Sequence, residues 1–414
     1  MPSPNVAVGY LQVGAAEHGI CRYGRLLAAE GRRRGDLAVR EERVVLVGRR
    51  IADHRALRDT ARRLSGVDLV HLQVSVWSAG SWGTGLSALR NLRTFRRHCP
   101  VPIVVTLHDA NALRFYPRST AIKWLSQIPL ELAKGLVRPG VRLVKQLGKR
   151  RLSRQQLFQD LWALEVPYPW FVAHEASRMA SAVFVLTRPE TQVLESGASE
   201  NKTVLIPHFV EEAPVTVSSA GREAGEKTVV VAGFLTRSKG HSLILEAMRL
   251  LPEVRIVFVG GPSVDARNSE YEGGLMETAE RAGVQDRLEV TGYLPDDEYY
   301  RRLAEADLAV CAFYNEKSAS GSLASLIATG TPILASDVPL IAEYNAIVEK
   351  AIPTFSPNTA EELAAAIRNT LATSREELTR PLGELRERLS LSSIYERHMH
   401  VYRRVIRSHR KAGR

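Results

Sequence analysis

Residues 316–336 read EKSASGSLASLIATGTPILAS, which predicts a polar loop, a helix and a strand in succession. The loop holds the small residues Ser318, Ser320, Gly321 and Ser322, and a Gly-Thr-Pro turn separates the helix from the apolar strand. The start of a helix exposes backbone N–H groups, and the helix dipole favours negative charge there. The stretch therefore predicts an α/β unit with a loop that suits an anion.

Each polar residue of this loop has a functional interpretation and a structural one. A carboxylate such as Glu316 can hold ribose or sugar hydroxyls through charged hydrogen bonds, and Gly321 lets the backbone approach a ligand closely. Alternatively, Ser320 or Ser322 is only an N-cap and Glu316 is solvated. Both interpretations hold together, because a cap site is also an anion site.

A second loop of this kind lies upstream at residues 233–240, GFLTRSKG. Lys239 can reach a diphosphate while the following helix N-terminus binds the other oxygens, and Arg237 adds positive charge. The order Lys-Gly excludes a Walker A loop, and an ordinary surface loop is the alternative interpretation. Two phosphate-compatible loops in one half favour an enzyme that binds a nucleotide-diphosphate sugar.

Apolar runs alternate with helical patterns along the chain. The predicted strands of the first half are 6–8, 44–47, 69–72, 103–107, 183–186 and 204–206. The alternation restarts with predicted strands 228–232, 255–259, 288–291, 308–312 and 332–335. Repeated β-α units predict doubly wound parallel sheets. Two sets predict an α/β protein with two Rossmann-like domains facing across a cleft, where such folds bind ligands.

The 414 residues suit two domains, and composition suggests their limits. We expect an N-terminal acceptor-side domain over 1–209, with a basic insertion at about 118–160. The polar segment 210–226 contains Pro, Ser and Gly, as linkers do. We expect the donor domain over 227–385 and a C-terminal helix, 386–414, that packs back on the N-terminal domain.

Three scattered cysteines form neither a disulfide framework nor a zinc cluster, which favours a reducing cytosol. No signal-peptide pattern opens the chain, and no apolar run approaches the roughly 20 residues of a membrane span. Asp296 and Asp297 are expected to cap a helix. Without an Asp-x-Asp motif we expect no metal. The predicted location is cytoplasmic, peripheral at the inner face of the membrane.

The formal net charge of +11 is concentrated between Arg118 and Arg154, where ten Lys or Arg residues meet one acid. From Pro139 onward a helix would place basic and apolar residues on opposite faces. Such a helix can lie on an anionic membrane surface, or it can be a solvated helix that covers the sheet. The residues of this predicted membrane and acceptor patch are Arg138, Arg142, Lys145, Lys149, Arg150 and Arg151.

The C-terminal half resembles the retaining glycosyltransferases of family four, which have the GT-B fold. Their pattern Gly-Arg-Leu-x-x-x-Lys-Gly corresponds to 233–240, a Gly-Tyr turn to 292–294, and the final Glu-x7-Glu and Gly-x-Pro stretch to 316–336. The resemblance makes Lys239 the diphosphate-binding lysine. It also implies donor contacts by Gly233, Tyr293, Leu294 and the loop residues Glu316, Ser318, Ser320, Gly321 and Ser322.

The chain departs from this family pattern at three positions. Phe234 replaces the usual Arg, Lys317 stands where the first Glu belongs with Glu316 one residue away, and Ser325 replaces the second Glu. These changes affect the expected ribose contact. The Ser-x-Ser-Gly loop resembles a variant branch of the same family.

The N-terminal half resembles the family more loosely. Gly19 stands where the family's glycine loop approaches the donor, although a plain turn glycine is an equal alternative. His108, at the end of a predicted strand, matches a histidine beside the transferred sugar, although most single histidines are structural. The resemblance implies that Lys239, Arg237 and the helix starts stabilise the leaving diphosphate, which itself takes the acceptor proton.

The expected function is transfer of a sugar, with retention, from a nucleotide-diphosphate sugar to a hydroxyl acceptor that is lipid-linked or otherwise anionic, in glycan or polysaccharide assembly. A GT-B epimerase and a non-catalytic nucleotide-sugar-binding protein use the same loops and stay open as alternatives. A nucleic-acid-binding protein is a weaker alternative, since the basic stretch has few aromatics and the chain has no helix-turn-helix, zinc-finger or RNP signature.

Overall fold

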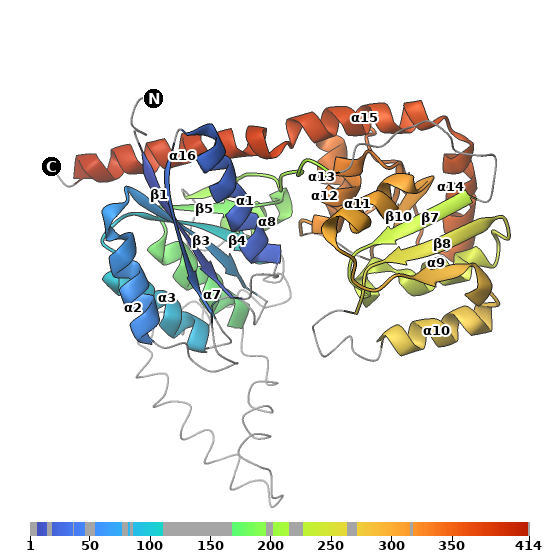
Figure 1. Cartoon of the computed structure of the whole chain (residues 1–414), viewed down its shortest axis with the longest axis horizontal. Helices are drawn as coiled ribbons and strands as arrows, with labels where there is room; N and C mark the ends of the chain where they lie inside the picture. Colours follow the sequence, from blue (N-terminus) through green and yellow to red (C-terminus); the bar gives the residue numbers. More distant parts are fainter. Residues whose placement is uncertain are drawn as a thin grey trace, which may run out of the picture. The chain divides into compact units, whose positions relative to one another are not determined.

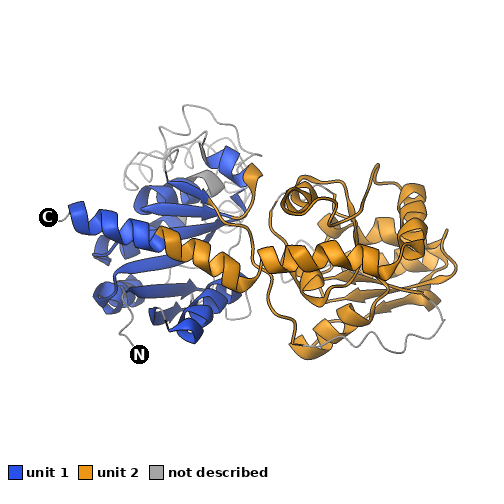
Figure 2. Cartoon of the chain, turned by 90° about the horizontal axis from the view of Figure 1, so that it is seen from above, with its two compact units in different colours: residues 1–185, 190–204, 402–414 blue, residues 186–189, 205–401 orange. Residues whose placement is uncertain are grey.

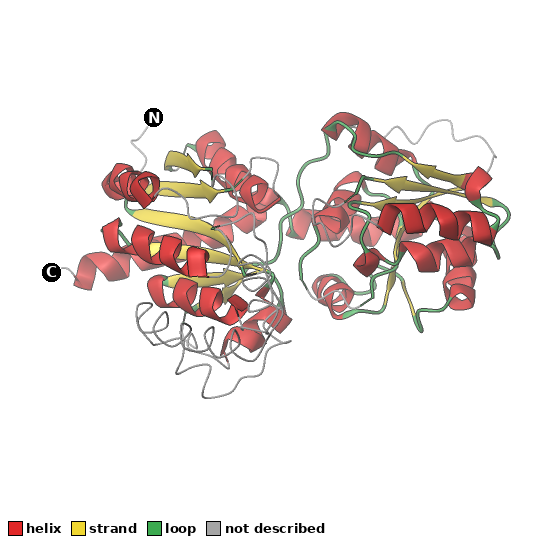
Figure 3. Ribbon diagram, turned by 90° about the horizontal axis from the view of Figure 1, so that it is seen from below, coloured by secondary structure: helices red, strands yellow, loops and turns green. Residues whose placement is uncertain are grey.

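The computed structural model describes residues 6–14, 19–35, 37–45, 54–76, 82, 86–110, 168–195, 202–214, 227–262, 271–314 and 318–412. They form two compact units, each treated by itself below. Unit 1 comprises residues 1–185, 190–204 and 402–414, and unit 2 comprises 186–189 and 205–401 (Figure 2). In each unit helices enclose a sheet (Figure 3). The expected insertion at 118–160 and residues 215–226 of the expected linker lie outside the described residues.

Unit 1 is built around a six-stranded sheet of order β2-β1-β3-β4-β5-β6 (Figure 1). Its strands are β1 (Ala7–Val13), β2 (Ala38–Val44), β3 (Leu69–Ser75), β4 (Ile103–His108), β5 (Ala182–Val185) and β6 (Thr203–Leu205). Its helices are α1 (Gly19–Arg34), α2 (His54–Arg63), α3 (Leu86–His98), α7 (Tyr168–Met179) and α8 (Arg188–Glu195), with a 3-10 turn at Leu64–Gly66.

The helices of unit 1 cover both faces of its sheet. α1 leads from β1 to β2 in one direction, whereas α2 leads back from β2 to β3 in the other. Because parallel crossovers are right-handed, α1 and α2 lie on opposite faces. α2 contacts α3, and α3 contacts α7, so these three helices form one layer (Figure 1). The α1 face is the one that carries the polar side chains described below.

Strand β2 corrects one prediction. The apolar run 44–47 was expected to be the strand, but the strand is the charged segment Ala38–Val44, which pairs with β1 over its whole length. An edge strand tolerates exposed charges. Here Arg32 of α1 binds Glu41 at 2.7 Å and Arg63 of α2 binds Glu42 at 2.9 Å. The pairing with β1 and these ion pairs therefore decide which residues form the edge strand, and the apolar character of residues 44–47 does not.

Unit 2 has a second six-stranded sheet, of order β12-β11-β10-β7-β8-β9. Its strands are β7 (Lys227–Ala232), β8 (Val254–Val259), β9 (Leu288–Val290), β10 (Leu308–Cys311), β11 (Ile333–Ser336) and β12 (Thr354–Phe355). Its helices are α9 (His241–Met248), α10 (Tyr271–Ala282), α11 (Asp296–Glu305), α12 (Gly321–Thr329), α13 (Pro339–Ile347), α14 (Ala360–Ala372) and α15 (Arg375–Arg388), with 3-10 turns at Arg237–Lys239 and Gln285–Arg287.

A single apolar core joins the sheet of unit 2 to α9, α10 and α14. Ile244 and Met248 of α9, Ala279 of α10 and Ile367 of α14 are all fully buried in it. The apolar residues of β7, β8 and β10 supply the other side of the core. This packing fixes α9, and therefore the loop that leads into it, on the sheet.

The strand order of unit 2 sets the place of a ligand site. The chain runs from β7 outward to β9 and then returns to β10 on the other side of β7. The loops after β7 and β10 therefore flank the topological switch point, where open α/β sheets bind ligands. These two loops are the ones that the sequence singled out.

The last helix, α16 (Leu391–Ala412), belongs to unit 2 up to Val401 and to unit 1 from Tyr402. In unit 1 the buried hydroxyl of Tyr402 lies 2.7 Å from Nδ1 of His71 on β3. The Arg410 guanidinium binds Asp68 at 2.6 Å. Across the residues that the structure covers, no helix has the length and hydropathy required to span a membrane.

Candidate functional site

The two predicted loops of unit 2 meet at one contact. Nζ of Lys239, from the loop after β7, donates a hydrogen bond of 2.6 Å to Oγ of Ser322 in the first turn of α12. The ammonium also lies 5.5 Å from the centre of the Phe313 ring. The backbone N–H of Tyr314 donates to the carbonyl of Ser238 at 3.1 Å, which joins the two loops along their backbones.

The start of α12 faces this lysine with a capped helix end. Ser320 is the N-cap: its Oγ accepts from the backbone N–H of Leu323 at 3.4 Å and lies 3.1 Å from Oγ of Ser322. The cap interpretation is thus confirmed for Ser320. A helix N-terminus carries partial positive charge, so an ammonium on its first turn makes the same place doubly attractive to an anion.

Two glycines allow the loops to approach this closely. Gly240 has φ +70°, and a Cβ there would lie 2.0 Å from the backbone oxygen of Ala312. Gly233 has φ +99°, and a Cβ there would lie 3.2 Å from Nζ of Lys239 and 3.1 Å from Cβ of Ser322. Both positions require a conformation that favours glycine. Gly233 therefore leaves space directly beside the ammonium.

Arg237, the second predicted cation, lies in the 3-10 turn that precedes Gly240. Its guanidinium carbon lies 5.8 Å from the centre of the Tyr271 ring on α10. This cation–π contact holds the side chain against an aromatic face. A role of Arg237 at a diphosphate stays a prediction.

Two exposed aromatic rings lie in the loops that follow β7 and β9. Phe234, where the family has arginine, is 49% exposed, and Tyr293 is 60% exposed. Their rings pack edge to face with centroids 6.2 Å apart. The Tyr293 hydroxyl donates to the carbonyl of Pro262. The ring lies so close to Gly261 that a Cβ there would be 2.9 Å away. Leu294, the next predicted contact residue, is half-buried.

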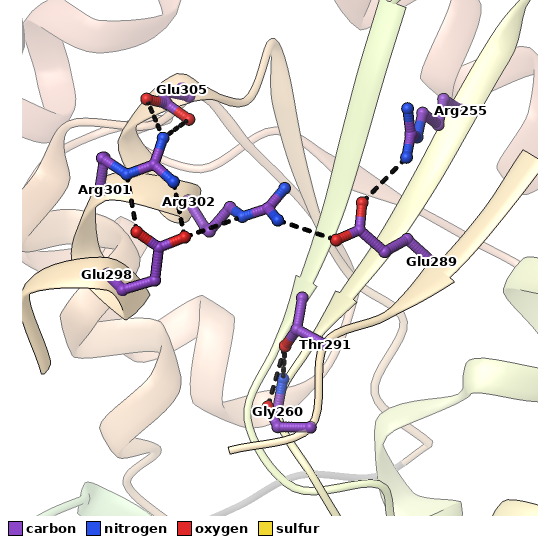
Figure 4. Close-up of polar contacts among 9 residues, drawn as sticks. Arg255, Gly260, Glu289, Thr291, Glu298, Arg301, Arg302 and Glu305 are labelled. Carbon is purple, nitrogen blue, oxygen red and sulfur yellow. Dashed lines mark hydrogen bonds and ion pairs between the residues drawn. The ribbon is translucent and has the colours of Figure 1, made fainter. Parts of the chain in front are cut away.

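A polar network supports the loop that carries Tyr293 (Figure 4). The hydroxyl of Thr291 accepts from the backbone N–H of Gly260 at 3.2 Å and donates to the carbonyl of Gly292 at 2.9 Å. Nearby, Glu289 on β9 binds Arg255 of β8 at 3.0 Å and Arg302 of α11 at 2.9 Å. These bonds tie β8, β9 and α11 together around the turn.

The same network continues along α11 and corrects the expectation for Asp296 and Asp297. Glu298 binds both Arg301 and Arg302, and Arg301 also binds Glu305 (Figure 4). The helix is preceded by Pro295, which occupies the N-cap position, and Asp296 and Asp297 lie in its first turn. As helical residues they interact with the helix dipole and do not cap it.

His241, the first residue of α9, is fully buried behind the Lys239 loop. Its Nδ1 donates to the carbonyl of Thr236 at 3.2 Å, and its ring packs on Phe258 with centroids 4.8 Å apart. Burial lowers its pKa to about 3, the Lys239 ammonium adds to that lowering, and the bond to Thr236 opposes it. The neutral ring braces the loop without adding a second charge beside Lys239.

The depressed pKa of His241 predicts a pH-dependent stability. Between the ordinary pKa of 6.5 and about 3, the unfolded chain binds a proton on this ring and the folded chain does not. Stability is therefore full above pH 6.5 and falls as the pH decreases through this window. His241→Phe should keep the aromatic packing and flatten the fall of melting temperature between about pH 7 and pH 5. If the melting temperature of His241→Phe fell with pH as steeply as that of the wild type, this account would be contradicted. His398, whose pKa is also lowered, contributes equally to the pH dependence of both proteins.

Comparisons with known proteins match this unit to a family. Residues 216–390 match the family described as "Glycosyl transferases group 1". This segment of the chain is therefore similar to the group 1 glycosyltransferases. It is 26% identical over 241 residues to 2-deoxystreptamine glucosyltransferase of Streptomyces kanamyceticus, which covers 53% of this chain and 59% of that protein. It is 28% identical over 111 residues to mannosylfructose-phosphate synthase of Agrobacterium fabrum, covering 26% and 24%. The alignments thus span less than two thirds of these relatives.

Solved structures share the fold of this chain over nearly its whole length. Anabaena Alr3699/HepE, solved in complex with UDP-glucose, superposes with a TM-score of 0.64 at 15% identity, covering 96% of this chain and 99% of that one. An α,α-trehalose-phosphate synthase (UDP-forming) from Burkholderia vietnamiensis gives 0.62 at 12% identity, covering 97% and 98%. Together with the two parallel sheets, this likeness confirms the predicted GT-B fold.

Two of the residues predicted from the sequence, Gly19 and His108, lie in unit 1. Gly19 is the first residue of α1 and is exposed, and among the residues that the structure describes none lies within 4 Å of a Cβ placed there. His108 ends β4, is nearly buried, and bonds through Nε2 to Oε1 of Gln73 at 2.9 Å. The next residue, Asp109, accepts from Ser75 at 3.0 Å, and burial raises the pKa of its carboxyl. The roles of Gly19 and His108 stay predictions.

Several predicted residues lie outside the described part of the chain: Glu316, Arg138, Arg142, Lys145, Lys149, Arg150 and Arg151. Ser318 is described and half-buried just before the N-cap of α12. Within the described ranges no group of three or more His, Cys, Asp or Glu side chains is arranged to hold a metal ion.

The structure adds site residues that the sequence interpretation missed. His241 and Tyr271 brace the Lys239 loop, and Gly260 and Gly261 shape the turn under Tyr293. A Gly-Gly pair directly after an apolar strand was a visible signal for close backbone approach. The bracing role of His241 has no signal of this kind, because it depends on packing.

Proposed function

We propose that this protein transfers a sugar from a nucleotide-diphosphate sugar to a hydroxyl acceptor, with retention of the anomeric configuration. The contact of Lys239 with Ser322 on the first turn of α12 is the observation that carries the proposal. It joins two loops at the switch point of the unit 2 sheet. It places a full positive charge beside the partial charge of a helix N-terminus.

This arrangement suits the chemistry of a diphosphate leaving group. When the bond between sugar and phosphate breaks, negative charge develops on the phosphate oxygens. A preorganised ammonium and the backbone N–H groups of a helix start stabilise that charge without reorganising during the reaction. Lys239 and the start of α12 would bind the diphosphate, and Arg237 would add charge from the same loop. The departing diphosphate would take the acceptor proton, so this scheme needs no protein carboxylate as base.

The exposed aromatic pair supports a nucleotide next to the diphosphate. Phe234 follows Gly233 directly in the loop after β7, and its ring meets that of Tyr293 in the loop after β9. Flat exposed rings offer stacking surface to a nucleobase, and the loop bonds of Thr291 hold one ring in place. We propose that Tyr293 and Leu294 contact the base and that Glu316 contacts ribose or sugar hydroxyls.

The comparisons support a nucleotide-sugar donor. The related protein from Streptomyces kanamyceticus is named a glucosyltransferase, and the HepE structure contains UDP-glucose. We also propose that the Ser-x-Ser-Gly loop marks a variant branch of the family, because Ser320 there caps α12 and the adjacent Ser322 contacts Lys239.

Ligand screening followed by product analysis tests the proposal. Melting temperatures are measured with UDP, GDP, ADP, TDP and their common sugar conjugates. A ligand at a hundredfold excess over its Kd stabilises the folded state by about 2.7 kcal/mol. The stabilising sugar conjugate is then incubated with hydroxyl acceptors, and the anomer of the product is determined by NMR. A retained glycoside supports the proposal; an isomerised donor sugar would instead show an epimerase, and no shift with any ligand would contradict donor binding.

The acceptor is proposed from charge. The excess of Lys and Arg between Arg118 and Arg154 suits an anionic or lipid-linked acceptor and peripheral attachment to a cytoplasmic membrane face. A triple substitution of Arg142, Lys145 and Lys149 by glutamine should therefore weaken sedimentation with vesicles that contain anionic phosphatidylglycerol. The matched control substitutes Arg403, Arg404 and Arg407, exposed on α16. Equal binding by the wild type and the first variant would contradict the proposed role of the segment.

A further inference from the structure

The carbonyl of Thr236 accepts two hydrogen bonds at the start of the Lys239 loop. The backbone N–H of Lys239 donates to it at 3.1 Å, which closes the 3-10 turn Arg237–Lys239. Nδ1 of His241 lies 3.2 Å from the same oxygen. A carbonyl oxygen only accepts and has two lone pairs, so the imidazole is a donor here and both bonds can form together. The turn that carries Lys239 is thus tied to the side chain of His241.

His241 holds this turn from a fixed point, because it is anchored in the core of unit 2. It is the first residue of α9, whose Ile244 and Met248 are fully buried. Its own ring is fully buried and packs edge-on against Phe258 of β8, with centroids 4.8 Å apart, and against Tyr271 of α10, with centroids 6.0 Å apart. The sheet and two helices therefore set the position of the imidazole N–H.

Packing alone does not explain a histidine at this position. Nε2 of His241 is buried and has no hydrogen-bond partner within the described part of the chain. A buried polar atom without a partner is costly, and phenylalanine would fill a site between two aromatic rings without that cost. What the imidazole adds is the bond from Nδ1 to Thr236. The ring orientation follows from that bond, because the turned ring would place a carbon against the carbonyl.

We propose that His241 is a positioning residue for Lys239. Through the Thr236 carbonyl it fixes the 3-10 turn, and the turn directs the Lys239 ammonium to Ser322 at the start of α12. Because His241 is fully buried, its effect on a bound diphosphate passes through Lys239. The inference rests on the proposed function, since it assigns His241 a role at the proposed diphosphate site.

Two substitutions separate the N–H donor from the packing of the ring. His241→Phe keeps the aromatic packing and removes the donor. We expect it to melt close to the wild type at about pH 8, well above the ordinary histidine pKa, and to bind a nucleoside diphosphate about tenfold more weakly, because the cation is displaced. In His241→Asn the amide nitrogen is as many bonds from the backbone as Nδ1. This variant should keep most of the diphosphate affinity, although its smaller side chain lowers the melting temperature.

A double-mutant cycle shows whether the effect passes through Lys239. Calorimetric titrations use UDP, GDP, ADP and TDP, each compared with its own nucleoside, and the proteins are the wild type, His241→Phe, Lys239→Ala and the double variant. We expect His241→Phe to weaken diphosphate binding about tenfold in the wild-type background and less than about twofold in the Lys239→Ala background. Nucleoside binding should change less than about twofold throughout. Structural damage would instead weaken nucleoside and diphosphate alike, and in both backgrounds.

The outcomes for this inference and for the proposed function are distinct. Diphosphate binding that His241→Phe leaves unchanged overturns the inference alone, as does an equal loss in both backgrounds. A loss in His241→Asn as large as that in His241→Phe would contradict the role of the N–H. A wild type that binds none of these diphosphates overturns the proposed function and, with it, this inference.

Discussion

Replacing Lys239 with alanine should lower turnover by about a hundredfold or more, because the leaving diphosphate loses its preorganised cation. The Lys239 ammonium bonds the Ser322 hydroxyl on the first turn of α12. Its removal also relieves the crowding beside Gly233. We therefore expect the melting temperature to change little. Initial rates at saturating donor measure the effect.

Lys227→Ala is the matched control for this experiment. Lys227 is also in unit 2, at the start of β7, where it forms an exposed ion pair with Asp307. Exposed pairs contribute little, so this variant should keep both activity and stability. Near-wild-type turnover by Lys239→Ala would remove Lys239 from the mechanism. A comparable loss in Lys227→Ala would mean that the effect is not specific to the site.

Gly240→Ala should be the most destabilising single-methyl substitution that we predict. The added Cβ would lie 2.0 Å from the backbone oxygen of Ala312, and φ is +70°. A backbone oxygen cannot rotate away from the new methyl group as the end of a flexible side chain can. The Lys239 loop or the end of β10 must therefore move. We expect a loss of about 4 kcal/mol or more, which is at the extreme for one substitution. Urea denaturation of the variant measures it.

Gly283→Ala is the control that separates the cost of the steric clash from the cost of backbone strain. Gly283 has nearly the same conformation, φ +64°, but a Cβ there meets nothing within 4 Å. Only backbone strain remains, which costs about 1 kcal/mol. Similar losses in the two variants would show that the contact between the loop and β10 is not as close as described.

The sequence was sufficient to predict the large features of unit 2. The apolar strands, the Gly-rich loop 233–240 and the Ser-rich loop before α12 have strong local signals, and the strand order then brings the two loops together. The family resemblance added the prediction that Lys239 binds the diphosphate. Ser320 as the N-cap also follows from local chemistry, since its side chain bonds a backbone N–H only three residues later.

Features that depend on distant partners were not predictable in this way. The charged strand Ala38–Val44 is a strand because of its neighbours β1, α1 and α2. The bonds of Gln73 with His108 and of His71 with Tyr402 join residues 35 and 331 positions apart. The tight approach of Gly240 to Ala312 likewise appears only after β7 and β10 are paired. Local patterns carry no signal for such contacts.

Calorimetric titration tests the central claim, that Lys239 and the start of α12 form the diphosphate site, most directly. The ligands are the nucleoside diphosphate that stabilises the wild type most and the nucleoside of the same base. The proteins are the wild type, Lys239→Ala and Lys227→Ala. We expect Lys239→Ala to lose most of the affinity that the diphosphate adds over the nucleoside, while nucleoside binding and Lys227→Ala match the wild type. Equal diphosphate affinity in the wild type and Lys239→Ala would contradict this account.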